Sequence, residues 1–197
     1  MGSIDPFKLI APLYDRIFFK LRTDALYGQL KLPALCLLDV GGGTGRVTTG
    51  LNGVESIVII DPSMAMLSAA RQKKGLWLVN GKAEQMPLAD NSFDRIVVVD
   101  AFHHFQDQER AVKELLRVLT PGGRLVIQEP DIRHWSVKLI ALGERLVRMD
   151  SHFYDPEAIK KMFEIQGGRV FVNSDNNLTA WIVVEKPDTN AVDQDVK

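Results

Sequence analysis

Acidic residues and glycines stand at positions where they could surround one ligand. The clearest segment is DVGGGTG (39–45), in which a short apolar run ends in Asp39 and a glycine cluster. Glycines allow a tight turn from a strand into a helix and let a ligand approach the backbone closely. A second apolar run ends at Asp61, where an acid bonds ribose hydroxyls in comparable α/β sheets. The two segments predict a site for a ligand with amino and hydroxyl groups.

The glycine spacing argues against two other nucleotide-binding motifs. The dinucleotide fingerprint needs G-x-G-x-x-G, and counting from Gly41 its third glycine is Arg46 here. A phosphate-binding P-loop needs a Gly-Lys-Ser/Thr ending, which the turn lacks. The turn therefore fits an amino-acid-like group better than a phosphate, and a nicotinamide-dependent oxidoreductase is a disfavoured alternative.

Polar residues also follow three later apolar runs. The turn 81–84 follows the run 76–80, Asp100 follows 95–99, and Glu129 follows 124–128. His103 and His104 come shortly after Asp100. A neutral histidine there could act as a general base, because its pKa lies near working pH, or it could only shape a pocket; both interpretations stay open for His104. The histidines, acids and single cysteine lack the spacing of a zinc site, so no metal is predicted.

Strands and helices must alternate along the chain to position these residues. Helices are expected at 7–30 (in two pieces), 47–51, 63–73, 109–119, 137–148 and 156–163, and strands at 34–38, 56–60, 76–80, 95–99, 124–128, 169–172 and 180–184. This alternation predicts an α/β fold with a doubly wound, mostly parallel, seven-stranded sheet. The turn between the last two strands is too short for a crossover helix, so they should form a C-terminal antiparallel hairpin.

Length and composition set the broad limits. The 197 residues suggest one domain over 1–186, with an N-terminal helical part at 5–30 and a disordered tail at 187–197. The net charge of −1 argues against general nucleic-acid binding, and Cys36 alone cannot form an internal disulfide. The apolar runs are far shorter than a membrane span, and the first residues do not form a secretory signal. We expect a cytoplasmic monomer or homodimer.

The chain resembles class I S-adenosylmethionine (SAM)-dependent methyltransferases, in the small-molecule branch of the ubiquinone/menaquinone-biosynthesis (UbiE-like) enzymes. The resemblance spans about 7–130 and rests on APLYD (11–15), LDVGGGTG (38–45), DPSM (61–64), AEQMPL (83–88), SFD (92–94), HHF (103–105) and RVLTPGG (117–123). It implies a Rossmann-like methyltransferase fold, SAM as cofactor and S-adenosylhomocysteine (SAH) as product. The implied acceptor is a small molecule, quinone-like or otherwise apolar, with the acceptor atom left open.

The resemblance also implies roles for matching residues. Tyr14 would lie on a lid over the cofactor, formed by the N-terminal helices. The methionine part of SAM would be held by Asp39, Gly41, Gly42, Gly43 and Gly45, and the ribose by Asp61 and Pro62. The adenine would be met by Met64, Ala83 and Glu84, and the sulfonium would lie near Asp100 and Ala101. His103, His134, His152 and Tyr154 would line the acceptor pocket, and His104 is the candidate catalytic residue. Lys82 stands where the family usually has an acid for the adenine amino group, so either Glu84 substitutes or the backbone alone holds adenine, and weaker cofactor binding is expected.

Two further alternatives follow. Base-methylating enzymes of this fold commonly carry an Asn/Asp-Pro-Pro-aromatic segment after the fourth strand. The sequence DAFH (100–103) in its place argues against a nucleic-acid substrate. A non-catalytic SAM-binding module that acts on a partner protein stays open, because Lys82 departs from the family pattern.

Overall fold

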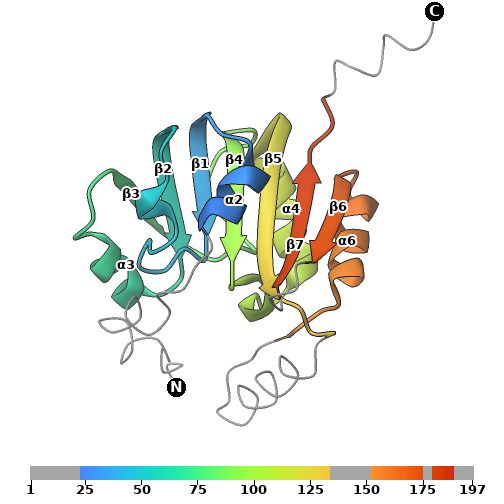
Figure 1. The fold of residues 1–197 in the computed structure, drawn as a ribbon. Helices are drawn as coiled ribbons and strands as arrows, with labels where there is room; N and C mark the ends of the chain where they lie inside the picture. The colour runs from blue at the N-terminus through green and yellow to red at the C-terminus, as the bar shows by residue number, and fades with distance from the viewer. Residues whose placement is uncertain (1–22, 134–151, 175–178, 189–197) are drawn as a thin grey trace, which may run out of the picture.

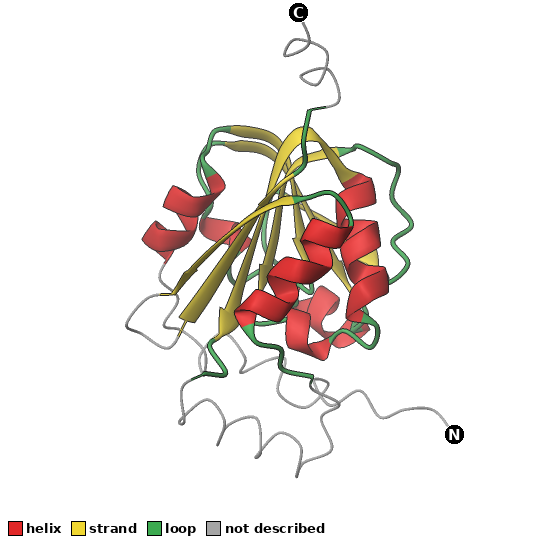
Figure 2. Ribbon diagram, turned by 90° about the vertical axis from the view of Figure 1, so that its right-hand side faces the viewer, coloured by secondary structure: helices red, strands yellow, loops and turns green. Residues whose placement is uncertain are grey.

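A seven-stranded sheet runs through the middle of the molecule, with helices on both faces (Figures 1 and 2). The computed structural model describes residues 23–133, 152–174 and 179–188. The strand order is β3-β2-β1-β4-β5-β7-β6. The strands are β1 (Ala34–Val40), β2 (Val54–Asp61), β3 (Leu76–Asn80), β4 (Phe93–Val99), β5 (Leu119–Pro130), β6 (Arg169–Ser174) and β7 (Thr179–Glu185). Strand β7 runs antiparallel to both of its neighbours, β5 and β6, whereas the other described strand pairs are parallel, so the predicted fold class and C-terminal hairpin are confirmed.

Both faces of the sheet are buried, which explains why its central strands read as continuous apolar runs. Successive residues of a strand point to opposite faces: Leu37 and Val97 belong to one core cluster, and Leu38 and Ile96 to the other. Helices α4 (Gln108–Val118) and α6 (Pro156–Ile165) contribute to the second cluster, and α2 (Thr23–Leu30) to the first. The strand ends that carry the site therefore belong to a rigid, buried scaffold.

Helices α3, α4 and α6 each begin at a residue whose side chain caps the helix. Ser63 caps α3 (Met64–Ala70) by accepting the Met66 amide at 3.3 Å. Asp107 and Asp155 cap α4 and α6 in the same way. A side-chain oxygen at this position satisfies a backbone donor that the helix itself cannot pair. Helices α2, α3, α4 and α6 thus confirm the predicted helices at these places, with ends shifted by a few residues.

The helix expected at 47–51 is wrong. The structure has only a three-residue 3₁₀ turn, η2 (Thr48–Gly50). Thr48 and Thr49 are β-branched and precede a glycine, which makes them poor helix formers. Their hydroxyls are also occupied elsewhere, since Thr48 donates to Asp39 and Thr49 to the Gly45 carbonyl. Side-chain bonds of this kind compete with the helical ladder. The expected helices 7–22 and 137–148 and most of the tail, 189–197, lie outside the described residues.

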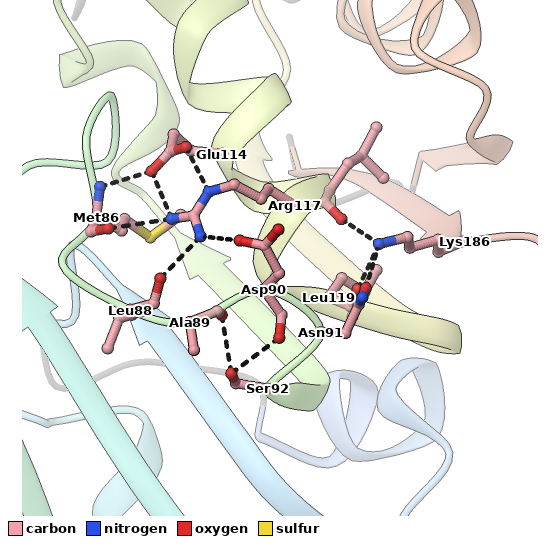
Figure 3. A network of polar contacts seen from close by, with 11 residues as sticks. Met86, Leu88, Ala89, Asp90, Asn91, Ser92, Glu114, Arg117, Leu119 and Lys186 are labelled. Atoms are coloured by element: carbon pink, nitrogen blue, oxygen red, sulfur yellow. Dashed lines mark hydrogen bonds and ion pairs between the residues drawn. The ribbon is translucent and has the colours of Figure 1, made fainter.

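Arg117 fixes the loop 81–92 between β3 and β4 to α4 (Figure 3). Its guanidinium donates to the carbonyls of Met86 (3.0 Å) and Leu88 (2.8 Å) and to the carboxylates of Asp90 (2.6 Å) and Glu114 (2.7 and 2.9 Å). Glu114 in turn accepts the Met86 amide at 2.7 Å. The loop that carries Ala83 and Glu84 is therefore held by four charge-assisted bonds, three from Arg117 and one to Glu114, rather than by a helix of its own.

Replacing Arg117 by lysine should lower the free energy of unfolding by about 2–3 kcal/mol. Lysine keeps the charge but has three donors on one atom, so it cannot reproduce the planar fork that spans the loop and Glu114. Bonds to charged groups are each worth about 1.5–3 kcal/mol, and those between partly exposed groups lie at the low end. Urea denaturation measures the loss. The control is Arg110→Lys at an exposed position of the same helix, expected to stay within about 0.5 kcal/mol; equal effects would contradict the anchoring role.

Candidate functional site

Four carboxylates lie at the carboxyl ends of neighbouring parallel strands. Asp39 lies near the end of β1, Asp61 ends β2, Asp100 follows β4, and Glu129 lies near the end of β5. Since β1 pairs with β2 and β4, and β4 pairs with β5, these ends share one edge of the sheet. Ligands of open α/β sheets bind at this edge, so the structure brings the predicted acidic residues to one site.

The glycine turn after β1 has a backbone that only glycine adopts easily. Gly41, Gly43 and Gly45 have φ values of +70°, +56° and +72°, in the left-handed region. The Gly41 amide donates to the Ile60 carbonyl at 2.8 Å, and a Cβ at Gly41 would lie 2.7 Å from the Ala101 Cβ. At Gly43 an added Cβ would meet nothing nearer than 3.9 Å. The turn is thus closed against β2 and Ala101, while Gly43 leaves room for a ligand.

Asp61 connects the glycine turn to the start of α3. One carboxylate oxygen accepts the Gly43 amide at 2.9 Å, and the other accepts the Ser63 amide at 2.7 Å. Each carboxylate oxygen can accept two hydrogen bonds. These two amides therefore do not by themselves fill the carboxylate of Asp61. Its bond to the Ser63 amide, just before α3, is compatible with a ligand role.

Asp39 is buried beneath the turn. It accepts the Thr48 hydroxyl at 2.9 Å, and a Cβ on Gly42 would lie within 3 Å of its carboxylate. Burial raises the pKa of Asp39 to about 7; the charge of Asp61 also raises it, while the Thr48 bond and Arg46 lower it. A bound cation or ammonium group would favour its ionised form. This position suits the amino group of a ligand's methionine part.

The free energy of unfolding of the ligand-free protein should depend on pH through the titration of Asp39. Because the folded pKa of about 7 exceeds the ordinary value of 3.8, the contribution is present at low pH and is lost as pH rises through 7. Asp39→Asn, which has no charge to bury, should gain stability relative to wild type between pH 5 and pH 7.5, by about 1 kcal/mol or more. Urea denaturation at both pH values measures this difference. A difference that stays constant with pH would contradict the raised pKa.

Glu129 binds the turn that follows β4. One of its oxygens accepts the amides of Ala101 (3.0 Å) and Phe102 (2.8 Å), and the other lies 2.5 Å from Nδ1 of His103. The sequence singled out Glu129 as an acidic strand end, but gave it no role in the site. Its partners lie in the turn that follows another strand, β4, and they meet Glu129 because β4 and β5 are paired.

His103 and His104 have different surroundings. His103 is buried, bound to Glu129 and stacked on Phe153 at 4.3 Å between ring centres. His104 is only partly buried, and burial followed by the neighbouring His103 lowers its pKa to about 3. A base is most effective when its pKa is near working pH, so His104 is neutral at pH 7 but weakly basic. The geometry favours the pocket-shaping interpretation of both residues.

The segment 152–155 lies against this turn. The His152 amide donates to the His103 carbonyl at 2.7 Å, and Gln108 donates to the His152 carbonyl at 3.4 Å. The backbone of His152 is thus next to His103, whereas its side chain is exposed, and Tyr154 is 39% exposed. Tyr14 and His134, the other two predicted residues of the lid and pocket, lie outside the described residues.

On the side where adenine is expected, the structure bears on the two alternatives that the sequence left open, Glu84 or the backbone alone. Met64 is 59% exposed beside Asp61 and Pro62, and Ala83 is buried. Glu84, however, accepts the amides of Gln106 (2.6 Å) and Asp107 (3.3 Å). Lys82 also reaches Gln106, at 3.1 Å. Both side chains therefore connect the loop to the start of α4, which favours backbone recognition of adenine over a Glu84 carboxylate.

In the described part of the chain, no group of three or more His, Cys, Asp and Glu side chains is arranged to hold a metal ion. None of the helices within 23–133, 152–174 and 179–188 has the length and apolar character needed to cross a membrane.

Comparisons with known proteins agree with the site. Residues 38–127 match the methyltransferase domain family. A 2-methyl-6-phytyl-1,4-hydroquinone methyltransferase of Oryza sativa is 33% identical over 130 residues, covering 59% of this chain and 37% of that protein. The ubiquinone/menaquinone biosynthesis C-methyltransferase UbiE of Vibrio cholerae is 32% identical over 108 residues, covering 49% and 42%. The chain thus aligns with about two fifths of the length of these relatives.

Solved structures share the fold over nearly the whole chain. A SAM-dependent methyltransferase of Thermotoga maritima superposes with a TM-score of 0.76 at 24% identity, covering 91% of this chain and 98% of that one. The [4+2]-cyclase SpnF superposes with a TM-score of 0.74 at 18% identity, covering 92% and 94%. At these identities the likeness concerns the fold alone. With the domain match and the UbiE relative added to it, the chain is similar to the class I SAM-dependent methyltransferases and resembles their UbiE-like branch.

Proposed function

We propose that the chain binds SAM at the carboxyl edge of its sheet and transfers the methyl group to a small-molecule acceptor. The observation that carries the proposal is the bond between Asp61 and the Gly43 amide. It joins Asp61, which is expected to bind the ribose, to Gly43 of the left-handed turn. An added Cβ would lie within 3 Å of another atom at the other three glycines of the turn but not at Gly43. The buried Asp39 below the turn supplies the charge partner for the methionine amino group.

The work left to the protein is binding and alignment. SAM, when bound, supplies a methyl group activated by a positively charged sulfonium. In this proposal the glycine turn and Asp39 hold its methionine part, Asp61 orients the ribose, and the backbone of Ala83 meets the adenine. Holding two reactants in line converts a bimolecular step into a nearly unimolecular one and can lower the barrier by several kcal/mol.

We infer that the acceptor is a hydroquinone-like aromatic molecule. Two relatives carry names that support this class, one a hydroquinone methyltransferase and one a quinone-biosynthesis C-methyltransferase. The stacked pair His103 and Phe153 adds an aromatic wall beside the turn after β4. Because His104 is a weak base, an acceptor with an electron-rich ring carbon, which attacks the methyl group first and loses its proton to water afterwards, suits the described part of the site.

Calorimetric titration with SAM and SAH tests the binding half of the proposal. We expect both to bind, with dissociation constants in the micromolar range typical of substrates. No heat of binding at millimolar ligand would overturn it. The acceptor half is tested by transfer of a labelled methyl group from SAM to a panel of hydroquinones, with catechols, amines and carboxylic acids for comparison; transfer to amines alone would overturn the acceptor class.

A second candidate is a non-catalytic SAM-binding module. The observation that favours it is the loop before α4, where Lys82 and Glu84 bind Gln106 and Asp107 instead of facing the adenine position. The fold is also shared by a protein named as a cyclase. Binding of SAM with no methyl transfer across the whole panel would favour this candidate over the enzyme.

A further inference from the structure

Glu129 is a buried carboxylate with three donors from one turn. It accepts the successive amides of Ala101 and Phe102, and it contacts Nδ1 of His103 at 2.5 Å. Both Glu129 and His103 are about 4% exposed. Buried charges are found where they are hydrogen-bonded, because removing a carboxylate from water is otherwise expensive. The whole turn after β4 is therefore arranged around this one side chain.

The residue before those amides has an unusual backbone. Asp100 has a φ of +50°, which side-chain-bearing residues rarely adopt; holding it there costs about 1–2 kcal/mol. Its own amide donates to the Gln128 carbonyl at 2.9 Å, and the next two amides donate to Glu129. Gln128 and Glu129, adjacent residues of β5, thus bind the amide of Asp100 and the two amides that follow it. Backbone strain of this kind persists where the surrounding structure over-determines it, typically at functional sites.

The same carboxylate is connected to the segment 152–155. His103, which it contacts, stacks on Phe153, and the His103 carbonyl accepts the His152 amide at 2.7 Å. If Glu129 is ionised it can only accept, so Nδ1 of His103 carries the proton. Glu129 therefore sets the conformation of Asp100 and Ala101 on one side and the orientation of the His103 ring on the other.

We propose that Glu129 is a positioning residue of the cofactor site, which holds the turn 100–103 and supplies a buried negative charge that favours the sulfonium of SAM over the neutral thioether of SAH. This inference rests on the proposed function, because it assigns Asp100 and Ala101 to the neighbourhood of the sulfonium. In a buried site a fixed charge acts on a cation with little screening, whereas its effect on a neutral sulfur is small. The carboxylate should therefore discriminate between cofactor and product.

The charge of Glu129 reaches Asp100. Burial, followed by the charge of Glu129, raises the pKa of Asp100 to about 6, while Arg46 and His103 lower it. These groups come from the glycine turn, the turn after β4 and β5, which surround Asp100. Removing the Glu129 charge should therefore lower the pKa of Asp100 in the ligand-free protein.

Glu129→Gln tests the charge with the shape kept. Its carbonyl oxygen can still accept the Ala101 and Phe102 amides, while its NH₂ faces Nδ1 of His103. Calorimetry should show the dissociation constant for SAM raised by roughly tenfold and that for SAH by less than about threefold. NMR titration should show a lower Asp100 pKa, and the imidazole proton of His103 should move from Nδ1 to Nε2. An equal loss for SAM and SAH, or no loss, would overturn the proposal.

Asp94→Asn is the matched control. Asp94 also accepts two successive amides, Leu35 (3.2 Å) and Cys36 (2.7 Å), but at the start of β1, the opposite end from the site. The Asp94→Asn variant should leave the ratio of the dissociation constants for SAM and SAH unchanged. Glu129→Asp is the complementary variant, which keeps the charge and shortens the reach to the amides. It should weaken SAM and SAH to a similar extent, and binding as in wild type would contradict the positioning role even if Glu129→Gln fails to fold.

The two proposals can fail separately. A wild-type protein that binds neither SAM nor SAH would overturn the proposed function and, with it, the discrimination by Glu129. A wild type that binds both, with a Glu129→Gln variant of unchanged ratio, would overturn only the role of Glu129. An Asp100 pKa that does not respond to Glu129→Gln in the ligand-free protein would overturn the charge coupling independently of any ligand.

Discussion

Asp61→Ala should raise the dissociation constant for SAM by roughly 100-fold, because alanine removes both acceptors of the proposed ribose pair. Two bonds to a carboxylate are together worth about 3 kcal/mol at the low end of their range, which corresponds to a factor of about 100. The same change releases the Gly43 and Ser63 amides, so the glycine turn loses its attachment to the end of β2. Calorimetric titration of the variant with SAM measures the effect.

The control must separate ligand binding from the loss of two backbone partners. Asp94→Ala removes a carboxylate that also accepts two amides, those of Leu35 and Cys36, at the far end of β1. Both variants should lose free energy of unfolding, by about 2 kcal/mol, but only Asp61→Ala should weaken SAM. If the two variants bind SAM alike, Asp61 has only a structural role.

Most of the fold could be predicted because each element has a local signal. The strand 76–80 was predicted with the bounds that β3 has, since four apolar residues, 76–79, and then Asn80 stand between Gly75 and Gly81. Ser63, a residue type favoured at the N-cap, caps α3 at the start of the helix predicted at 63–73. The helix 47–51 was wrong because Thr48 and Thr49 form bonds with Asp39 and Gly45 that no periodicity reveals.

The site could be predicted in its backbone but less well in its side-chain partners. Glycine spacing and acidic strand ends indicated the turn and Asp61, because each is a local feature of the sequence, although the bond that joins them links residues 18 apart. The partners of Glu129 are 26–28 residues away in sequence, and those of Glu84 are 22–23 residues away. Contacts at such separations depend on how β4, β5 and α4 pack. His103 was expected to line the pocket, and its Glu129 contact could be seen only after the strands were paired.

Gly41→Ala should lower SAM affinity by about 100-fold or more while leaving a folded, less stable protein. The new Cβ would lie 2.7 Å from the Ala101 Cβ, and Ala101 cannot move freely because Glu129 holds its amide. The turn must therefore shift, which displaces the amides next to the methionine position. Overpacking of this kind costs about 1–3 kcal/mol, and the left-handed φ of +70° adds about 1–2 kcal/mol of strain.

Gly122→Ala separates these two contributions. Gly122 has nearly the same φ, +72°, but a Cβ there would meet no atom within 4 Å, and it lies in the first part of β5, away from the carboxyl ends of the strands. This variant should lose about 1 kcal/mol from backbone strain alone and bind SAM as the wild type does. Urea denaturation and calorimetry on the two variants compare the effects. Equal stability losses with SAM affinity intact in both would mean that the approach of Gly41 to Ala101 does not shape the cofactor site.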